Sequence, residues 1–392
     1  MRWHLNFIPT TLLENAILIN VAVFLVESRR QRTPIQWRSP LTIPAFLFIV
    51  AGAISVIDAP DRRAALGLFR AYLLEPVAFA LVAATICTNA RRAYLLVGGL
   101  CLGAIWLGVP NALVVLAAIK SHAYKVTDTP PTVIYLTQNA VALFLEPILG
   151  MVAAALLYTP GRRFKFGSLV ALVVLLPIEV LTFSRGGYLA MAATAFVLAL
   201  SHRRRLWLIP GILVTGLLLT RIPLIGERLA LETSNVYGNT VFFRYDIWTA
   251  TARLLKERPL TGAGLSGFAT RIAPFWNATH PLASQRFIDP HNIVLNFWVE
   301  TGILGLLAFG WLFFALGYLC LRTWRRADPT WRPLALGVFL ALVAIGVHGL
   351  VDVPYFKNDL SLEFWALLAI GLASYRATLA SNPHHPSRLR DA

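Results

Sequence analysis

Long apolar segments recur through this chain from Thr10 to Tyr375, separated by short basic clusters. Hydrophobic residues make up 57% of the sequence and charged residues 14%, whereas a soluble domain has about 25% charged residues. An apolar stretch of about 20 residues spans a bilayer as a helix. The sequence therefore predicts an all-α, polytopic membrane helix bundle.

We predict about eleven transmembrane helices, within a range of ten to twelve, because several apolar segments are shorter than a straight crossing needs. The predicted spans are 10–26, 41–57, 70–88, 93–118, 137–158, 166–183, 187–200, 206–220, 293–321, 334–351 and 361–375. They form a single transmembrane domain over 1–375, which includes one long loop at 221–292. Residues 376–392 are expected to be a disordered tail.

Basic residues predict how the chain is oriented. The loops on one side, with the tail, hold 19 Lys and Arg residues, and the short segments on the other side hold 8. A further 8 lie in 221–292, which is too long to count in a rule for short loops. Because basic loops stay in the cytoplasm, we predict a cytoplasmic C-terminus and an extracytoplasmic long loop. These clusters also explain the net charge of +16 without nucleic-acid binding.

Arg185 is a candidate for binding an anion. It follows an apolar span in "TFSRGG", where a guanidinium is costly unless it snorkels, pairs or lines a wet cavity. Gly186 and Gly187 are expected to allow a sharp turn and the close approach of a ligand. The alternative is a structural pair between Arg185 and Glu179. A planar guanidinium is a good donor for phosphate.

Arg244 is the second candidate of this kind. It lies within an apolar pattern with helical spacing, starting at Val241, that predicts an amphipathic helix at about 241–256 in the long loop. Aromatic residues surround Arg244 in sequence, which would desolvate its guanidinium and favour an anion. The alternative is an arginine on a solvated face.

His291 stands at the entrance of an apolar helix, in "DPHNIVLNFW". Asp289 is predicted as the N-cap and Pro290 as the first helical residue, so that His291 and Asn292 fall in the first turn. The positive end of the helix dipole disfavours protonation, which predicts a neutral imidazole available as a base. The alternative is an interfacial histidine that hydrogen-bonds a loop. No zinc-binding pattern includes these residues or His280, so we predict no metal site.

Further candidates for binding substrate are Asn292, His348, Asp352 and Lys357. His348 and Asp352 are four residues apart at a predicted extracytoplasmic helix end, which predicts that their side chains stack on one face. All of these residues are predicted on the same side of the membrane as Arg185 and His291.

Four carboxylates lie within the predicted spans: Glu75, Glu146, Glu179 and Glu300. An ionisable group inside a membrane is a pairing or functional candidate, including a proton-relay group of a transporter. Arg70 is the expected partner of Glu75. The expected partner of Glu300 is a helix N-terminus or a Lys residue.

Three segments carry a resemblance to a known family: "TFSRGGYLAMAA" (182–193), "RYDIWTATARLLKERPLTGAGLSGF" (244–268) and "HNIVLNFWVETGILGLLAF" (291–309). In this order and at these intervals, they resemble the O-antigen ligase and polymerase superfamily of bacterial envelope glycan assembly. The resemblance implies a membrane fold of the GT-C type in the bacterial inner membrane, with the active site on the periplasmic face. It also implies that Arg185 and Arg244 hold a diphosphate and that His291 activates an acceptor hydroxyl.

The implied function is a metal-independent, inverting glycosyltransferase that uses no cofactor and takes a glycan from a polyprenyl-diphosphate carrier. The acceptor is a lipid-A core in a lipopolysaccharide ligase, another carrier-linked glycan in a polymerase, a protein hydroxyl or a cell-wall polymer, and the sequence leaves this choice open. We expect a monomer. The alternatives are a transporter or flippase of lipid-linked glycans, a protein O-oligosaccharyltransferase, or a scaffold subunit of an envelope complex.

Overall fold

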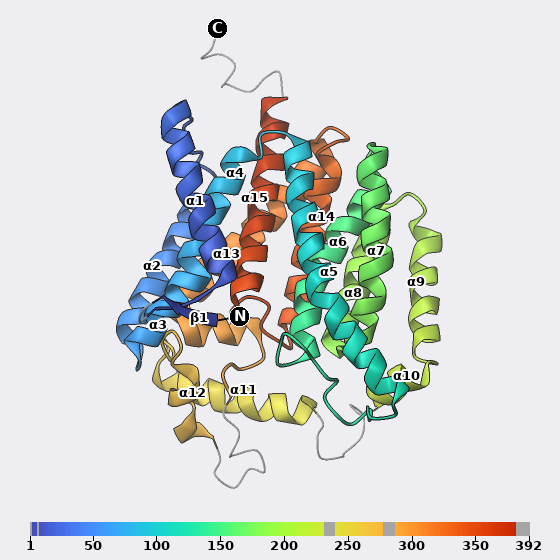
Figure 1. Cartoon of the computed structure of the whole chain (residues 1–392). Coiled ribbons are helices and arrows are strands. Elements are labelled where there is room, and N and C mark those ends of the chain that lie inside the picture. The colour runs from blue at the N-terminus through green and yellow to red at the C-terminus, as the bar shows by residue number, and fades with distance from the viewer. Residues whose placement is uncertain (1, 6–7, 231–239, 277–286, 382–392) are drawn as a thin grey trace.

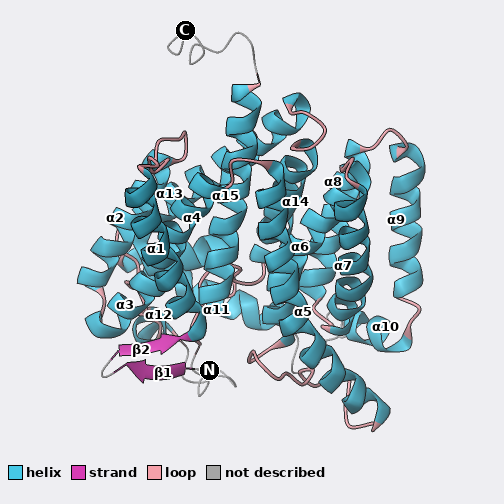
Figure 2. Ribbon diagram, turned by 45° about the horizontal axis from the view of Figure 1, so that its top comes forward, coloured by secondary structure: helices cyan, strands magenta, loops and turns pink. Residues whose placement is uncertain are grey.

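A computed structural model of the chain describes residues 2–5, 8–230, 240–276 and 287–381 (Figure 1). The described residues are helical except for loops and one antiparallel hairpin, β1 (Arg2–Leu5) and β2 (Ile8–Thr11), which lies beside the bundle in Figure 2. The helices are α1 (Leu12–Gln31), α2 (Thr42–Asp58), α3 (Arg62–Phe69), the π-helix η1 (Arg70–Leu74), α4 (Glu75–Ile86), α5 (Ala90–Lys120), α6 (Gln138–Tyr158), α7 (Arg162–Leu181), α8 (Arg185–Ser201), α9 (Arg205–Leu219), α10 (Pro223–Ala230), α11 (Thr240–Glu257), α12 (Phe268–Arg271), the 3-10 helix η2 (Ala273–Phe275), α13 (Ile293–Arg326), α14 (Arg332–Gly349) and α15 (Asn358–Ala380).

Each of the eleven predicted spans falls on a helix, but fewer helices could cross a membrane on their own. Within the part of the chain that the structure describes, six are long and apolar enough by length and composition: the continuous run α3 to α4, and α5, α6, α7, α13 and α14. A seventh is added if α9 and α10, bent by 89° at a short break, count as one broken span. The chain is a multi-pass helical membrane protein, and the count of eleven crossings stays a prediction.

The predicted boundary between the last helix and the C-terminal tail needs correction. Helix α15 continues to Ala380, so residues 376–380 belong to the helix and not to the tail. Arg376 donates hydrogen bonds to the carbonyl oxygens of Ala84 at 3.1 Å and Gln36 at 2.8 Å, which holds this end of α15 against α4 and the loop after α1. The remainder of the predicted tail, from 382 onward, lies outside the described residues.

The centre of the bundle is formed by α6 and α14. Helix α6 packs against α5, α7, α8 and α14, and nearly all of its side chains are buried in protein. Helix α7, by contrast, is mostly exposed along its length. A polar group on α6 therefore faces other helices, where only protein groups or a bound molecule can provide its partners.

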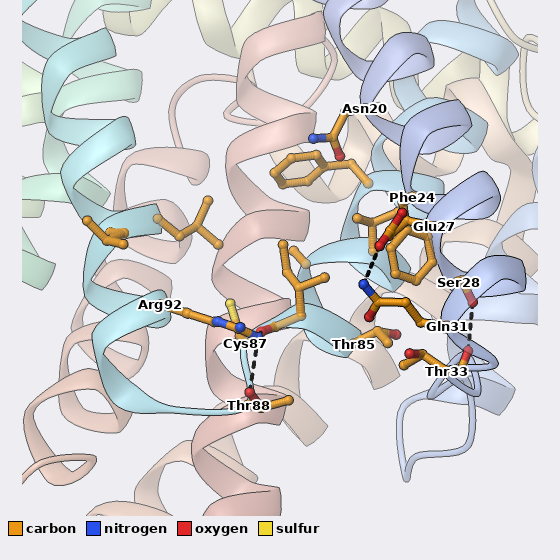
Figure 3. A pocket seen from close by; sticks show the side chains of 16 residues that line it. Asn20, Phe24, Glu27, Ser28, Gln31, Thr33, Thr85, Cys87, Thr88 and Arg92 are labelled. Carbon is orange, nitrogen blue, oxygen red and sulfur yellow. Dashed lines mark hydrogen bonds between the residues drawn. The ribbon is translucent and has the colours of Figure 1, made fainter.

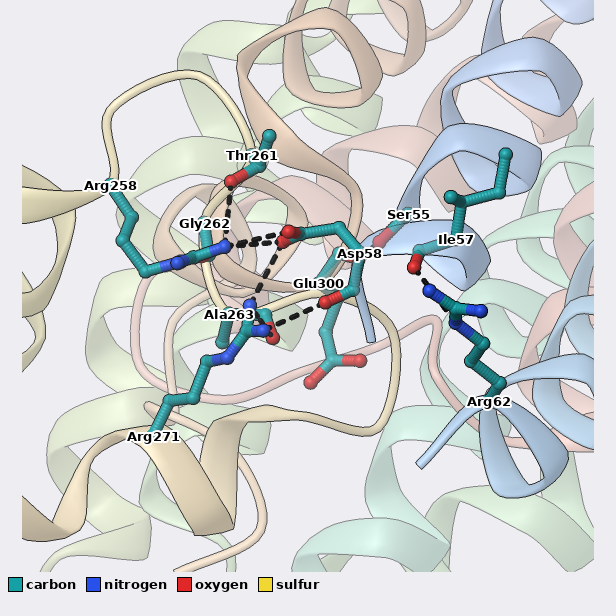
Figure 4. A network of polar contacts seen from close by, with 10 residues as sticks. All are labelled: Ser55, Ile57, Asp58, Arg62, Arg258, Thr261, Gly262, Ala263, Arg271 and Glu300. Atoms are coloured by element: carbon teal, nitrogen blue, oxygen red, sulfur yellow. Dashed lines mark hydrogen bonds and ion pairs between the residues drawn. The ribbon is translucent and has the colours of Figure 1, made fainter. Parts of the chain in front are cut away.

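Ion pairs and hydrogen bonds hold the described part of the long loop against the bundle. The carboxylate of Asp58, at the end of α2, accepts hydrogen bonds from Arg258 at 2.7 Å and Arg271 at 2.9 Å (Figure 4). The Glu300 carboxylate on α13 accepts from the backbone N–H of Ser266 at 2.7 Å, in place of the helix N-terminus or Lys residue expected as its partner. These contacts join residues 258–271 to α2 and α13.

Helix α13 is interrupted at Gly302, where φ is 68° and ψ is 179°. A Cβ atom at this position would collide with the carbonyl oxygen of Leu260, which instead accepts a hydrogen bond from the N–H of Ile303 at 3.1 Å. Glycine is needed here because the left-handed conformation and the close backbone contact both exclude a side chain. The break lets the loop pack directly against the helix.

Candidate functional site

Four segments meet at the end of the bundle where α11 lies (Figure 1): the start of α8, helix α11 itself, the residues before α13 and the residues after α14. The segment 350–352, which follows α14, connects them. Arg244 on α11 donates from Nε to the carbonyl oxygen of Val351 at 2.9 Å, and Asn292 donates from Nδ2 to that of Leu350 at 2.8 Å. The structure thus brings two predicted site residues to the same short loop.

His291 does not lie in the first turn of α13, as the sequence led us to expect. The N-cap is Asn292, whose Oδ1 accepts from the N–H groups of Val294 and Leu295 at 3.0 Å each. His291 precedes the helix in a left-handed conformation with φ 48°, and its N–H donates to Oδ1 of Asp289 at 2.9 Å. Asp289 therefore stabilises the turn before the helix, and the Asn292 side chain is occupied by capping α13 and holding the 350–352 segment.

The imidazole of His291 faces two carboxylates. Its Nδ1 atom lies 3.4 Å from Oδ1 of Asp289 and 3.6 Å from Oδ1 of Asp352. Burial disfavours the charged ring, but the Asp352 and Asp289 carboxylates outweigh burial and the opposing charge of Arg244, and they raise the pKa of His291 above its ordinary value. The predicted effect of the helix dipole is thus overridden, because tertiary contacts place negative charge beside the ring.

Asp352 is held in place by several donors. Its Oδ2 accepts from Asn139 Nδ2 at 3.2 Å, and its Oδ1 accepts from the N–H of Val353 at 2.8 Å. Burial would raise its pKa, but His291, His348 and Lys357 hold the pKa of this carboxyl well below its usual range. Asp352 is therefore an ionised partner for His291, a role that its place in the sequence did not reveal.

Lys357 acts on Asp352 through its charge and lies over the ring of Tyr135, with Nζ 5.9 Å from the ring centroid. The loop between them is anchored by Tyr355, which is fully buried and donates from its hydroxyl to the carbonyl oxygen of Tyr72 in the π-helix at 2.9 Å. This hydrogen bond fixes the positions of Asp352 and Lys357.

His348 turns into the bundle instead of stacking on Asp352. Its Nδ1 lies 2.7 Å from Oε1 of Glu146 on α6, and the side chains of both residues are 1% exposed. Glu179 on α7 is also buried, and neither of its carboxylate oxygens has a hydrogen-bond partner within the described residues. The expected alternative, a pair between Arg185 and Glu179, is thus not formed.

The start of α8 packs onto this buried cluster. A Cβ atom on Gly186 would lie 2.5 Å from Nε2 of His348 and 3.1 Å from Cγ2 of Val351. A Cβ atom on Gly187 would lie 2.6 Å from Oε1 of Glu179 and 2.9 Å from Oε1 of Glu146. The two glycines were expected to make room for a ligand. In the structure they make room for protein side chains within a regular helix.

Arg185 is the first residue of α8, directly after the N-cap Ser184, whose side chain accepts from the N–H of Gly187 at 3.1 Å. The neighbouring Gly186 contacts Val351, and the backbone of Val351 binds Arg244. The backbone at the start of α8 therefore lies beside the segment that Arg244 binds. A helix N-terminus and two guanidinium groups make this end of the bundle suited to an anion.

A cavity of about 700 Å³ lies at the opposite end of the bundle, between α1, α4 and α5 (Figure 3). Phe24, Thr85, Cys87 and Arg92 are among its lining residues. Arg92 donates to Thr88 Oγ1 at 3.2 Å and to the carbonyl oxygen of Ile86 at 2.9 Å. None of the predicted site residues lines this cavity.

The other expected pair, Arg70 with Glu75, is confirmed: Arg70 Nε lies 3.2 Å from Glu75 Oε1. Arg70 also binds Glu14 at 2.6 Å, which the sequence did not predict. Within the residues that the structure describes, no group of three or more His, Cys, Asp or Glu side chains is arranged to hold a metal ion.

Residues 178–310 match the family model described as O-Antigen ligase. The matched segment contains Arg185, Arg244 and His291, and it ends before the His348 and Asp352 segment that completes the geometry. No curated protein matches the chain significantly. The match supports glycosyl transfer of the O-antigen ligase or polymerase type, and it supports the resemblance of this chain to the O-antigen ligase and polymerase superfamily.

Proposed function

We propose that this protein is a metal-independent, inverting glycosyltransferase that moves a glycan from a polyprenyl-diphosphate carrier to an acceptor hydroxyl. The observation that carries the proposal is the arrangement of His291, Asp352 and Arg244 around one loop, inside or beside the segment that matches the family. A base with an oriented carboxylate, next to a guanidinium, is what displacement of a diphosphate by a hydroxyl requires.

In the proposed reaction, the acceptor oxygen attacks the anomeric carbon as the bond from that carbon to the diphosphate oxygen breaks. The proton of the acceptor hydroxyl passes to Nε2 of His291, because Nδ1 faces Asp289 and Asp352. Asp352 orients the ring and stabilises the imidazolium that forms. The electron pair of the broken bond leaves with the diphosphate, and a single displacement inverts the anomeric centre.

The departing diphosphate gains negative charge, which Arg244 and Arg185 would neutralise. The backbone contact from Arg244 Nε to Val351 fixes the direction of its guanidinium. The same contact holds that guanidinium close to His291, because both groups border the 350–352 segment. Lys357 adds positive charge at the edge of the site.

We further propose that the fold is of the GT-C type, that the site faces the periplasm of a bacterial inner membrane, and that the C-terminus is cytoplasmic. The basic loops and the position of all site groups at one end of the bundle support this orientation. The acceptor is a lipid or another glycan, which makes the enzyme a ligase or a polymerase, and we expect it to act as a monomer.

A direct test uses the purified full chain in lipid nanodiscs with a polyprenyl-diphosphate glycan and, in separate reactions, lipid-A core and carrier-linked glycan as acceptors. We expect one acceptor to become glycosylated and His291→Ala to slow transfer by about 1000-fold. His202→Ala, at the other end of α8, is the matched control and should transfer at the wild-type rate. A wild-type rate for His291→Ala would exclude the histidine as the base.

One observation favours the second candidate, a transporter of lipid-linked glycans. The buried Glu146, His348 and Glu179 cluster lies inside the bundle, where proton-coupled transporters keep ionisable groups. Proton flux into liposomes that follows the addition of a lipid-linked glycan, without any glycosylated acceptor, would support transport over transfer.

A further inference from the structure

The cavity between α1, α4 and α5 lies away from the groups assigned to glycosyl transfer (Figure 3). Its volume of about 700 Å³ falls within the range of about 300–1,000 Å³ that is usual for sites of small ligands. Two of its walls, α4 and α5, belong to candidate membrane spans. Leu95 on α5 lines the cavity and is 63% exposed. The cavity therefore opens at the side of the bundle, which lipid surrounds in a membrane.

The lining changes from apolar to polar along the helices. Phe24 of α1, Phe79 of α4 and Leu96 of α5 form the inner part. Figure 3 shows Asn20 at the far end and Thr88 with Arg92 at the other. Polar side chains gather at this second end, beside the loop between α4 and α5: Ser28, Gln31, Thr33, Thr85, Thr88 and Arg92. The cavity thus matches a molecule with a long apolar part and a polar head.

The length of the cavity matches the depth of one leaflet. Along α1 it extends from Asn20 to Gln31, which corresponds to about 16 Å of α-helix. Along α4 it extends from Phe79 to Ile86, or about 10 Å. Half of the hydrocarbon core of a bilayer is about 15 Å thick. An acyl chain that enters from the polar end therefore has room to extend through the inner part.

Arg92 supplies positive charge at the polar end. Its guanidinium donates to the carbonyl oxygen of Ile86 at 2.9 Å and to Oγ1 of Thr88 at 3.2 Å, and both acceptors are neutral. It forms no ion pair within the described residues. These acceptors fix the guanidinium but leave its charge available to an anion.

Glu27 also lines the cavity and would oppose an anion there. Its carboxylate accepts a hydrogen bond from Gln31 and lies 3.9 Å from Nη1 of Arg30, so it has a basic partner of its own. The segment 27–32 contains three arginines against this one glutamate, and Arg91 adds a further positive charge beside Arg92. The basic groups therefore outnumber the acidic one at this end.

We propose that the cavity binds one phospholipid with an anionic headgroup. An acyl chain fills the inner part, and the phosphate oxygens accept hydrogen bonds from Arg92. The basic clusters predict that this end faces the cytoplasm, where the leaflet carries anionic lipids and basic pockets between membrane helices bind their headgroups. This site is independent of the proposed glycosyl transfer, because it shares no residue with it.

The test uses the purified full chain in detergent with equimolar dioleoyl phosphatidylglycerol and dioleoyl phosphatidylcholine. Native mass spectrometry counts the lipids that stay bound, and we expect one phosphatidylglycerol in preference to phosphatidylcholine. Arg92→Gln should lower this preference about fivefold, the effect of one basic group on an anionic lipid. Glu27→Gln removes the opposing carboxylate and should raise the preference. Ala83→Phe places a larger side chain in the lining and should lower retention of both lipids.

Arg91→Gln is the matched control, because Arg91 is exposed on the same helical turn and is not one of the described residues that line the cavity. It should keep the wild-type preference. Equal losses in Arg91→Gln and Arg92→Gln would mean that surface charge alone attracts the lipid, which would overturn the site.

Two other results would also overturn the site: equal retention of the two lipids by the wild type, and wild-type retention by a folded Ala83→Phe variant. Thermal unfolding of each variant separates loss of the fold from loss of lipid. Because Arg92 is exposed, Arg92→Gln keeps the test decisive if Ala83→Phe does not fold.

Discussion

Nδ1 of His291 lies 3.6 Å from Oδ1 of Asp352, although the two residues precede different helices. The segment before α13 supplies the imidazole, and the loop before α15 supplies the carboxylate. Asn139 and the N–H of Val353 hold Asp352, so the carboxylate is oriented independently of the histidine. Orientation of a histidine by a fixed carboxylate favours one tautomer and leaves the opposite nitrogen to accept a proton.

The first prediction concerns pH. His291 acts as a base only when deprotonated, and its pKa is raised above 6.5, so the transfer rate should rise with pH through a value above 6.5. Asp352→Asn removes a charge that favours the imidazolium, so the rising limb should move to lower pH. The maximal rate should fall by about 100-fold, because the ring loses its orienting partner. The measurement is kcat/KM against pH, and a limb that does not move would contradict the pairing.

The second prediction concerns Gly186. Alanine there would place Cβ 2.5 Å from His348 Nε2, so Gly186→Ala should lower the thermal unfolding temperature and slow transfer at least about tenfold. Gly99→Ala is the control, because Gly99 lies in helix α5 with no atom within 4 Å of the added Cβ. It should be neutral or stabilising by about 0.5–1 kcal/mol. Equal behaviour of the two variants would show that the contact with His348 is unimportant.

The third prediction concerns the buried pair of Glu146 and His348. Glu146→Leu leaves the imidazole without its partner inside the bundle, and loss of one member of a buried pair costs about 3 kcal/mol. The double variant Glu146→Leu with His348→Leu should recover part of that stability, since no polar group then remains unpaired. Thermal unfolding of the two single variants and the double variant gives the coupling free energy between Glu146 and His348. Strictly additive losses of stability would mean that the two residues do not interact.

The fourth prediction concerns the anchor of the long loop. Asp58→Asn removes the charge that holds Arg258 and Arg271, and because these groups are partly exposed we expect only about 1 kcal/mol of destabilisation. The larger effect should be faster proteolysis within residues 258–271, while the membrane helices stay protected. Asp61→Asn, which alters only the cap of α3, is the control for a charge change nearby. Identical cleavage patterns would rule out the anchor.

Much of the helical architecture follows from local patterns. Hydropathy placed a helix at every predicted span, and the apolar spacing around Trp248 predicted a helix at 241–256 where the structure has Thr240–Glu257. The basic clusters and the position of Arg185, Arg244 and His291 in the sequence also predicted that these three residues belong to one end of the bundle. Hydropathy, charge and helix spacing are properties of neighbouring residues, and a sequence displays them directly.

The remaining features depend on packing between distant segments. Asp352 helps to raise the pKa of His291, His348 occupies the space that Gly186 leaves, and the N–H of Ser266 is the partner of Glu300. Each of these pairs joins residues that no local pattern connects, and each depends on separations of a few Å between helices. Electrostatic and steric energies change steeply over such distances, so the chemical state of the site is defined only once the bundle is assembled.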